Sequence, residues 1–403
     1  MVQALVVIAG LLALMAMLAA DQRASVQGVQ DRLRQRRAEA AGEAAVVRAL
    51  AVLQDANPNV VTPGDAWAKL GDGGNEEFDL GDATFRMQIV DCGSLVNVNS
   101  APPEQLERLP LNQDQIHCLL DWREPKTQPR PDGAKDAYYN SLPTPYNAAL
   151  GPLATTDELL LVKNWTGQTL YQAPPSAFAD QLLTDGQGTA LPLASLLTVD
   201  SGAANARADG SPRINLGQPG VAPNALTQAG ISPDVAMRIA SQAPFASFSA
   251  LLATPGLQTE TINQLLDAAA FTDAKRVEGK INLNTAPQAV LRTLPNVTPA
   301  LAAAIVSRQS AGFHSLSELA SVRGVDPPLL AKIADSFTIG SDTWIVRAYG
   351  RSGGVGTAVE ATVGLRDGHA RIVTWTRLNT TGIPLWWGWD AQTTATGDAG
   401  DAS

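Results

Sequence analysis

The N-terminal segment begins as an uninterrupted apolar run and continues as an amphipathic pattern. Residues 2–20 carry no charged side chain and one strongly polar one, Gln3. As a helix, this run would span roughly 30 Å, about the hydrocarbon thickness of a membrane. Pro58 is the first helix breaker. Before it, apolar residues continue at helical spacing, namely Val26, Val29, Leu33, Ala40, Val47 and Leu50. The pattern predicts one continuous helix over residues 1–54.

Period-two alternation indicates β-strands on both sides of a long helical region. Strands are expected at residues 76–80, 84–90, 343–349, 357–365 and 370–377. The economical topology is one small antiparallel sheet that is interrupted by an inserted helical module, with the N-terminal helix covering one face of the sheet. The expected fold class is therefore α+β.

The region between the two groups of strands repeats itself. Val96–Pro103 reads VNVNSAPP, Ile214–Ala222 reads INLGQPGVA and Ile281–Pro287 reads INLNTAP. Each copy is followed by a leucine-rich helical stretch, which predicts three copies of one helical hairpin unit. The asparagines that recur near the start of each copy are interpreted as turn and cap residues rather than ligands. They are Asn97, Asn215 and Asn282.

These patterns divide the chain into segments. The expected boundaries are 1–54 for a membrane and stalk helix, 55–95 for the first part of the sheet, 96–183 for a first helical unit with a proline-rich acidic loop, 184–212 for a linker, 213–272 and 280–338 for the second and third units, 340–380 for the final strands, and 381–403 for a mobile tail. For the tryptophans beside that tail, packing on the sheet edge is favoured over contact with a partner. They are Trp386, Trp387 and Trp389.

Charge and composition disfavour two classes of function. The formal net charge is −10, whereas a nucleic-acid partner calls for clustered Lys and Arg. The sequence has 3 His and 2 Cys without zinc spacing, and it lacks a phosphate-binding glycine loop, a serine nucleophile elbow and an HExxH motif. We therefore expect no enzyme. Cys92 and Cys118 are compatible with a disulfide or with two buried free thiols.

Three interpretations fit the apolar N-terminal run. A cleaved secretory signal would have to use Leu18-Ala19-Ala20 as its cleavage site and would lack the usual basic segment. A plain membrane anchor would leave the amphipathic continuation unexplained. A stalk of the pilin type explains both halves, and we favour it.

Four short motifs, in order along the chain, resemble those of the K-type minor pseudopilins of bacterial type II secretion. They are Asp121-Trp122-Arg123, Tyr138-Tyr139, Pro145-Tyr146 and Asp157–Val162 (DELLLV). The resemblance covers about residues 1–380. It implies a pilin-like helix and sheet carrying sterile-alpha-motif-like helical units, without enzymatic activity. It also implies a single-pass inner-membrane protein whose periplasmic head lies at the tip of a short pseudopilus, beside other minor pseudopilins and inner-membrane secretion assembly proteins.

The chain departs from the family pattern in two respects. It carries an extra hairpin copy, and no basic leader ending in Gly precedes the apolar run. Leu5 fits a tip position if the mature chain begins at or next to Met1, because most pilins have a membrane-buried Glu there that pairs with the terminal amine of the subunit ahead. The alternative is that Leu5 is one more membrane residue.

The resemblance also implies calcium near the acidic loop. Calcium takes six to eight oxygen ligands. The alternative is that these acids are solvated surface residues, because Lys126, Arg130 and Lys135 stand among them. The candidate ligands are Asp121, Glu124, Asp132, Asp136 and Asp157.

The third unit, residues 280–338, also resembles the helix-hairpin-helix units of competence DNA receptors. Its hairpin Pro295–Pro299 has no glycine to present backbone N–H groups to phosphate. A packing or protein-binding role is therefore favoured, and an envelope DNA-binding protein is the alternative function.

Overall fold

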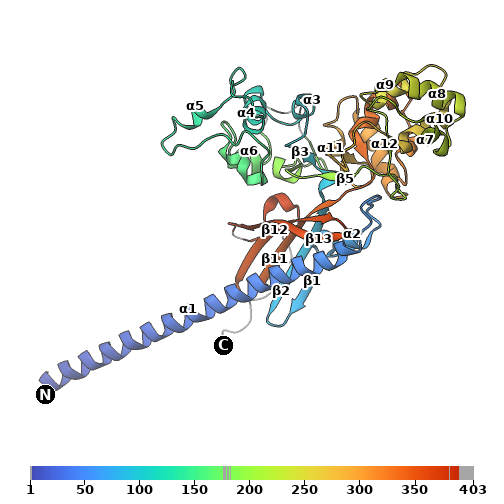
Figure 1. Ribbon diagram of the computed structural model, residues 1–403. Helices are drawn as coiled ribbons and strands as arrows, with labels where there is room; N and C mark the ends of the chain where they lie inside the picture. Colours follow the sequence, from blue (N-terminus) through green and yellow to red (C-terminus); the bar gives the residue numbers. More distant parts are fainter. Residues whose placement is uncertain (1, 176–177, 179–180, 182, 381, 390–403) are drawn as a thin grey trace.

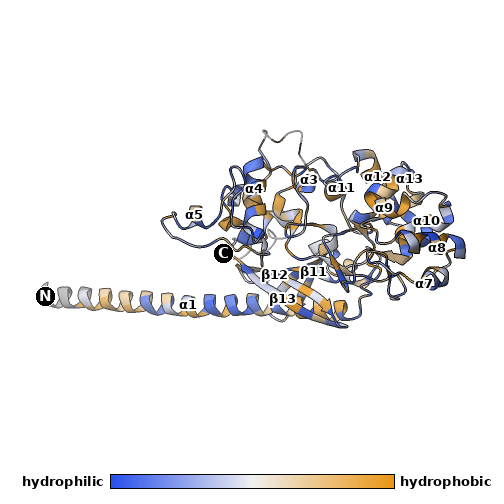
Figure 2. Ribbon diagram, turned by 45° about the horizontal axis from the view of Figure 1, so that its top comes forward, coloured by the Kyte–Doolittle hydropathy of each residue, from blue (hydrophilic) through white to orange (hydrophobic). Residues whose placement is uncertain are grey.

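The computed structural model describes residues 2–175, 178, 181, 183–380 and 382–389, except for the side chains of residues 2–7 and 9. α1 (Val2–Gln54) is one unbroken helix, as the pattern predicted. Its C-terminal half lies across the sheet and its N-terminal half extends away from the head (Figure 1). Hydrophobic and hydrophilic turns are mixed along it (Figure 2).

Small residues let α1 approach the sheet closely. The face that packs on the sheet repeats every three or four residues, as expected for a helix. Gly350 lies opposite it, where a Cβ atom would be 2.1 Å from the carbonyl oxygen of Ala38. Only glycine fits there, so this position sets the distance between helix and sheet. The buried residues of this face include Ala38, Ala41, Ala45, Val46, Ala49 and Leu53.

The sheet has five strands in the order β1-β2-β11-β12-β13, and all neighbours are antiparallel. Ile89 of β2 stands opposite Val346 of β11, although the whole helical region separates them in sequence. The predicted interrupted sheet and the α+β fold class are therefore confirmed. The strands are β1 (Glu77–Leu80), β2 (Ala83–Asp91), β11 (Thr343–Ser352), β12 (Val355–Arg366) and β13 (His369–Leu378). The short helices α2 (Ala66–Lys69) and η1 (Asp72–Gly74) precede them.

The stalk and the helical region leave the sheet at opposite ends. Arg37 of α1 forms an ion pair of 3.0 Å with Asp82, in the turn between β1 and β2. Gln54, at the other end of α1, donates to the carbonyl oxygen of Gly368 at 2.7 Å, in the turn between β12 and β13. The helical region is inserted at this second end, where β2 ends and β11 begins. In Figure 1 the helical region lies above the sheet, with α4 to α6 (residues 113–171) on the side toward which the stalk extends and α7 to α10 (residues 223–268) on the other side.

The helical region consists of three units, each closed by a parallel pair of two-residue strands. The first unit has β3 (Val96–Asn97), α3 (Pro103–Leu106), α4 (Gln113–Arg123), α5 (Asp136–Tyr139), η3 (Thr156–Leu161), α6 (Gly167–Tyr171), η5 (Leu193–Ser195) and β4 (Leu197–Thr198). The second has β6 (Ile214–Asn215), α7 (Pro223–Gln228), α8 (Pro233–Gln242), α9 (Phe248–Leu252), α10 (Thr259–Ala268) and β7 (Ala269–Ala270). The third has β9 (Ile281–Asn282), α11 (Gln288–Leu291), α12 (Pro299–Gln309), η6 (Leu316–Ser321), α13 (Pro327–Ile333), η7 (Ala334–Ser336) and β10 (Phe337–Thr338).

The prediction that residues 184–212 form a linker is wrong, because this segment contains two paired strands. β4 lies within it and pairs with β3, so the first unit ends at residue 198 rather than 183. A second strand in this segment, β5 (Gly202–Ala204), pairs with β8 (Arg276–Glu278). Leu193, Leu196 and Leu197 are buried. The Gly/Ala/Asp-rich composition concealed these short strands, because two or three residues give no periodicity.

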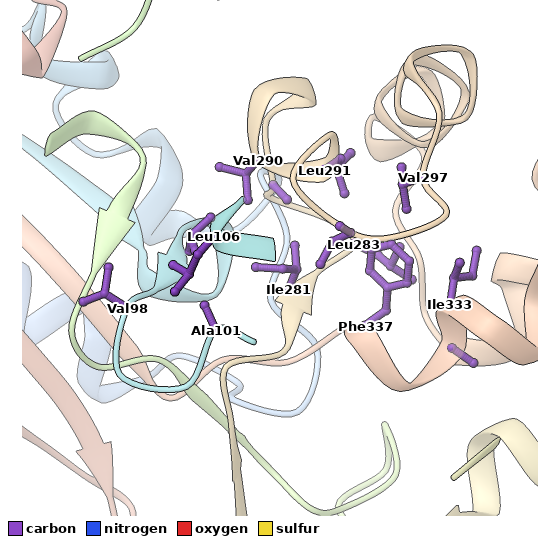
Figure 3. Packing of buried hydrophobic residues seen from close by; sticks show 14 of the residues in the cluster. Val98, Ala101, Leu106, Ile281, Leu283, Val290, Leu291, Val297, Ile333 and Phe337 are labelled. Atoms are coloured by element: carbon purple, nitrogen blue, oxygen red, sulfur yellow. The ribbon is translucent and has the colours of Figure 1, made fainter. Parts of the chain in front are cut away.

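The three units share one hydrophobic core rather than three separate ones. At the junction of the first and third units, Leu106 lies beside Ile281 and Val290 (Figure 3). The units therefore stabilise one another, as expected for repeats too small to bury an apolar face alone.

The predicted tail 381–403 also needs correction where it is described. Trp387 and Trp389 are buried against Tyr349 and Ala358, on the sheet face opposite α1. Trp387 lies in the short helix η8 (Leu385–Trp387), and its indole N–H donates to Glu360 of β12 at 2.6 Å. Trp386 packs against Tyr171 of the first unit, with ring centroids 4.4 Å apart and the rings tilted by 39°. The tryptophans therefore pack within the chain as predicted, but on a sheet face and on the first unit rather than on the sheet edge. Residues 390–403 lie outside the described part.

Candidate functional site: the loop of the first helical unit

The recurring asparagines fix the turn that begins each unit. The side-chain oxygens of Asn97, Asn215 and Asn282 each accept the backbone N–H two residues later, at 2.9, 2.8 and 3.0 Å respectively. This is the turn role that the sequence predicted.

A second asparagine distinguishes the first and third units from the second. The side chain of Asn284 donates to the carbonyl oxygen of Phe313 at 3.0 Å and accepts its N–H at 2.6 Å. Asn99 makes the same pair of bonds with Leu153, at 2.9 and 2.8 Å. The second unit has Gly217 instead, where a Cβ atom would be 2.2 Å from the carbonyl oxygen of Phe271. Backbone crowding there excludes any side chain.

The arginine of the Asp-Trp-Arg motif closes the loop that begins the first unit. Arg123 donates to the carbonyl oxygens of Val98 and, at 2.7 Å, of Ala101. Burial lowers the pKa of Arg123 from its ordinary value. In the third unit the neutral Gln309 makes the corresponding bonds, to Leu283 at 2.9 Å and to Ala286 at 2.8 Å.

The aromatic motifs meet in one cluster. Trp122 packs edge-on against Tyr139 and Tyr146, with ring centroids at 5.1 and 6.2 Å. Its indole N–H donates to Glu158 of the DELLLV motif at 3.2 Å. The hydroxyl of Tyr146 donates to the carbonyl oxygen of Leu161, also in that motif, at 2.8 Å. The motifs that carry the resemblance therefore form one structural site around the long loop of the first unit.

The acidic loop is held by its own basic residues. The carboxylate of Asp121 is fully buried and accepts the Arg130 guanidinium at 2.8 Å and its backbone N–H at 2.9 Å. The same guanidinium reaches both carboxylate oxygens of Glu124, at 2.7 and 2.8 Å. These acids raise the pKa of Arg130 against the opposing effect of its partial burial.

The five calcium candidates do not form one ligand set. Asp136 accepts the backbone N–H of Ala148, and Asp157 accepts the hydroxyl of Tyr171. Asp132 contributes its carbonyl oxygen to Cys118 and Lys163. Throughout the described residues, no group of three or more His, Cys, Asp or Glu side chains could hold a metal. The residues present therefore do not fit a calcium site.

The sequence did not predict a cluster of ion pairs that joins the helical units to the sheet. Arg276 forms ion pairs with Asp200 and Asp342, at 2.6 and 2.7 Å, and Arg366 bonds to both of these acids. The four residues lie far apart in sequence and belong to no motif, so no local signal could have revealed them. They join β8, β12 and the start of β11 to the end of the first unit.

A buried carboxylate fastens the third unit to the sheet. Asp91, at the end of β2, accepts Gly93 N–H at 2.8 Å, Asn282 at 2.9 Å and Thr285 at 2.5 Å. Burial raises the pKa of Asp91.

Two features of the helix-hairpin-helix region in the third unit disfavour phosphate binding. Arg308 is paired with Glu318. The second hairpin of this unit, between η6 and α13, has Gly324 at φ +93° between Arg323 and Val325. The next helix after it is capped by Asp326, which accepts Leu329 N–H at 2.8 Å. This carboxylate occupies the helix end where a phosphate would bind.

Two remaining predictions concern the cysteines and the N-terminal helix. Cys92 and Cys118 are both free and buried, so the free-thiol alternative holds in the structure. Burial raises the pKa of both thiols, that of Cys118 to about 11.

The side chain of Leu5 lies outside the described residues. Within the part of the chain that was described, no helix is long and apolar enough to cross a membrane.

Comparisons with known proteins agree with the motif site. A family model described as type II secretion system protein K matches residues 97–179, and one described as the helix-hairpin-helix motif matches residues 277–338. No match was found among curated proteins. A chain of the crystal structure described as the GspK-GspI-GspJ complex from the enterotoxigenic Escherichia coli type 2 secretion system is similar in fold, with a TM-score of 0.52 and 13% sequence identity, over 89% of this chain and 100% of that chain. The motif-bearing first unit therefore matches type II secretion system protein K, and the chain as a whole is similar in fold to a chain of the GspK-GspI-GspJ complex.

Proposed function

We propose that this protein is a non-enzymatic minor pseudopilin at the tip of a type II secretion pseudopilus, where it initiates or caps the filament. α1 anchors it in the inner membrane, and the head lies in the periplasm. Its partners are other minor pseudopilins and the inner-membrane secretion assembly proteins. No bond is made or broken, and the mechanism is assembly.

The single observation that carries this proposal is the separation of stalk and helical region to opposite ends of the sheet. The protruding half of α1 leaves near Asp82, and the helical region is attached where β2 ends at Asp91. If α1 enters the filament from the membrane, the helical region faces away from it. Such a region would obstruct a further subunit stacked above, which favours a tip position.

A second face of α1 supports assembly with other stalks. In the amphipathic part of α1, after residue 20, four large apolar residues stay at least half exposed on the side opposite the sheet-packing alanines. A helix with an apolar stripe that its own head does not cover favours packing against other helices. The comparison structure is itself described as a complex of GspK with GspI and GspJ. The stripe consists of Val26, Val29, Leu33 and Val47.

The tip position can be tested at Leu5. In a Leu5→Glu variant the carboxylate would find a terminal amine ahead of it in the filament body but none at the tip. The unpaired charge should cost a few kcal/mol in the membrane, so we expect weaker assembly and reduced secretion, whereas Leu5→Gln should do less harm. Assembly can be followed by co-purification with the other minor pseudopilins. If Leu5→Glu assembles and secretes as well as the parent, the tip assignment is wrong.

A further inference from the structure

The loop of the first helical unit balances its charges internally. Two acids at the end of α4, Asp121 and Glu124, face two cations from the following loop, Arg130 and Lys135. Lys135 is 5% exposed, a rare burial for a lysine. Such burial calls for specific partners.

The Lys135 ammonium is bound by carbonyl oxygens. It donates to the carbonyl oxygen of Asp121 and, at 2.8 Å, to that of Glu124. Both carbonyls lie in the last turn of α4, where helix carbonyls lack partners within the helix and carry partial negative charge. The ammonium therefore takes oxygens of the kind that a hard metal cation would use.

The Arg130 guanidinium takes the carboxylates. It binds Asp121 through one nitrogen and Glu124 through another, and its own backbone N–H adds a second bond to Asp121. Bonds of this charge-assisted type are the stronger ones in proteins. With Asp121 fully buried, removing the guanidinium would leave a buried carboxylate that lacks its cation.

The backbone closes the remaining space beside Asp121. A turn from Arg130 to Gly133 brings the loop over the carboxylate, with a bond of 3.0 Å from Gly133 N–H to the Arg130 carbonyl oxygen. A Cβ atom on Gly133 would be 2.0 Å from an Asp121 carboxylate oxygen. This contact leaves no room for an ion with its own ligand shell.

We propose that Arg130 and Lys135 are internal cations that order this loop in place of a bound divalent metal, so that the fold of the first unit does not depend on calcium. The inference rests on the contacts within the loop and is independent of where the protein sits in a filament.

The first test uses the full-length protein in detergent. Thermal unfolding is recorded with calcium at millimolar concentration and with excess EDTA. Because a ligand that binds only the folded state raises Tm, we expect the two Tm values to agree within about 1 °C. A Tm that falls by roughly 4 °C or more on chelation would show that a metal stabilises the fold and would overturn the proposal.

The second test removes the guanidinium. Arg130→Gln should lower Tm by roughly 5 °C, because it leaves Asp121 buried without its cation. Lys126→Gln is the matched control: it removes one positive charge from the same loop, but Lys126 is 75% exposed and lies 3.5 Å from Glu124. The control should shift Tm by less than about 1 °C. If Arg130→Gln unfolds like the parent, Arg130 does not order the loop. If it fails to fold, the calcium comparison on the parent still decides the question.

Discussion

The first and third helical units share one set of amide-to-backbone hydrogen bonds, here called the shared frame, but differ in the segments attached to it. In both, a side-chain amide binds the backbone in front of a 3-10 helix, Asn99 to Leu153 and Asn284 to Phe313. In the third unit only a short loop joins α12 to η6. This unit is also hydrogen-bonded to the sheet through Asp91. The first unit inserts the long loop and its aromatic cluster between α4 and η3. The amide-to-backbone contact is therefore common to both units, while the loop holds the motifs that carry the resemblance to protein K.

The largest expected effect comes from breaking the shared frame. Asn284→Ala would leave the buried N–H and carbonyl of Phe313 without partners, and should cost about 3 kcal/mol of unfolding free energy. Asn99→Ala should cost about 2 kcal/mol, because its site is partly exposed and water can replace some bonds. Urea unfolding of the full chain measures both, with the exposed Asn140→Ala as control. Equal, negligible losses for both variants would refute the shared frame.

The next effect distinguishes the charged from the neutral form of the same contact. Because Gln309 serves the third unit where Arg123 serves the first, Arg123→Gln should be partly tolerated, at about 1 kcal/mol. Arg123→Ala leaves the carbonyls of Val98 and Ala101 without a donor, and should cost about 2 to 3 kcal/mol. Chemical denaturation compares the two. If the glutamine variant is as unstable as the alanine variant, the two residues are not equivalent.

The loop of the first unit should also show a pH signature that the third unit lacks. Partial burial of Glu124 tends to raise the pKa of its carboxyl group, but the hydrogen bonds and charge of Arg130 outweigh this and lower that pKa below its ordinary 4.5. Its contribution to stability is therefore present above pH 4.5 and is lost as the pH falls through the lowered pKa. The parent should exceed Glu124→Gln in stability by about 1 kcal/mol at neutral pH and converge with it in acid. Unfolding curves over this range provide the measurement; a difference that grows toward acid would have the wrong sign.

The smallest expected effect concerns nucleic acid. The third unit has the helix-hairpin-helix pattern, but Arg308 is ion-paired and Asp326 occupies a helix end. We expect no binding of a DNA duplex by the full chain at physiological salt. Titration with a labelled duplex would detect it. Micromolar binding that weakens steeply with salt and is lost in Arg292→Glu and Arg308→Glu would instead support the DNA-receptor alternative.

The sequence predicted elements with a repeating local signal. Strands of nine or more residues such as β2 and β11 show alternation, and α1 shows helical periodicity, so the interrupted sheet and its covering helix could be derived. Asn97 and its equivalents act within two residues of their own position, so their role was also accessible. The missed features depend on distant partners. β4 has two residues and is defined by pairing with β3 about a hundred residues earlier. The Arg276 junction likewise exists only in three dimensions.

The acidic loop shows why acids that are close in sequence need not form one ligand set in the structure. Spacing brought the acids into one loop but could not show which cation they face. Arg130 and Lys135 were visible in the sequence, and only the turn ending at Gly133 places them against Asp121 and the end of α4. The backbone geometry of this turn therefore favours an internal ion pair over a metal, and the comparison of Tm in calcium and in EDTA tests this proposal.

The central claim, a single tip subunit in a complex of minor pseudopilins, is tested most directly by the stoichiometry of that complex. The full chain would be co-expressed with the other minor pseudopilins of its own secretion system, purified in detergent and weighed by native mass spectrometry. We expect one copy of this chain together with its partners, because the helical region obstructs a second copy above it. Complexes with several copies, or a chain that purifies alone, would contradict the account.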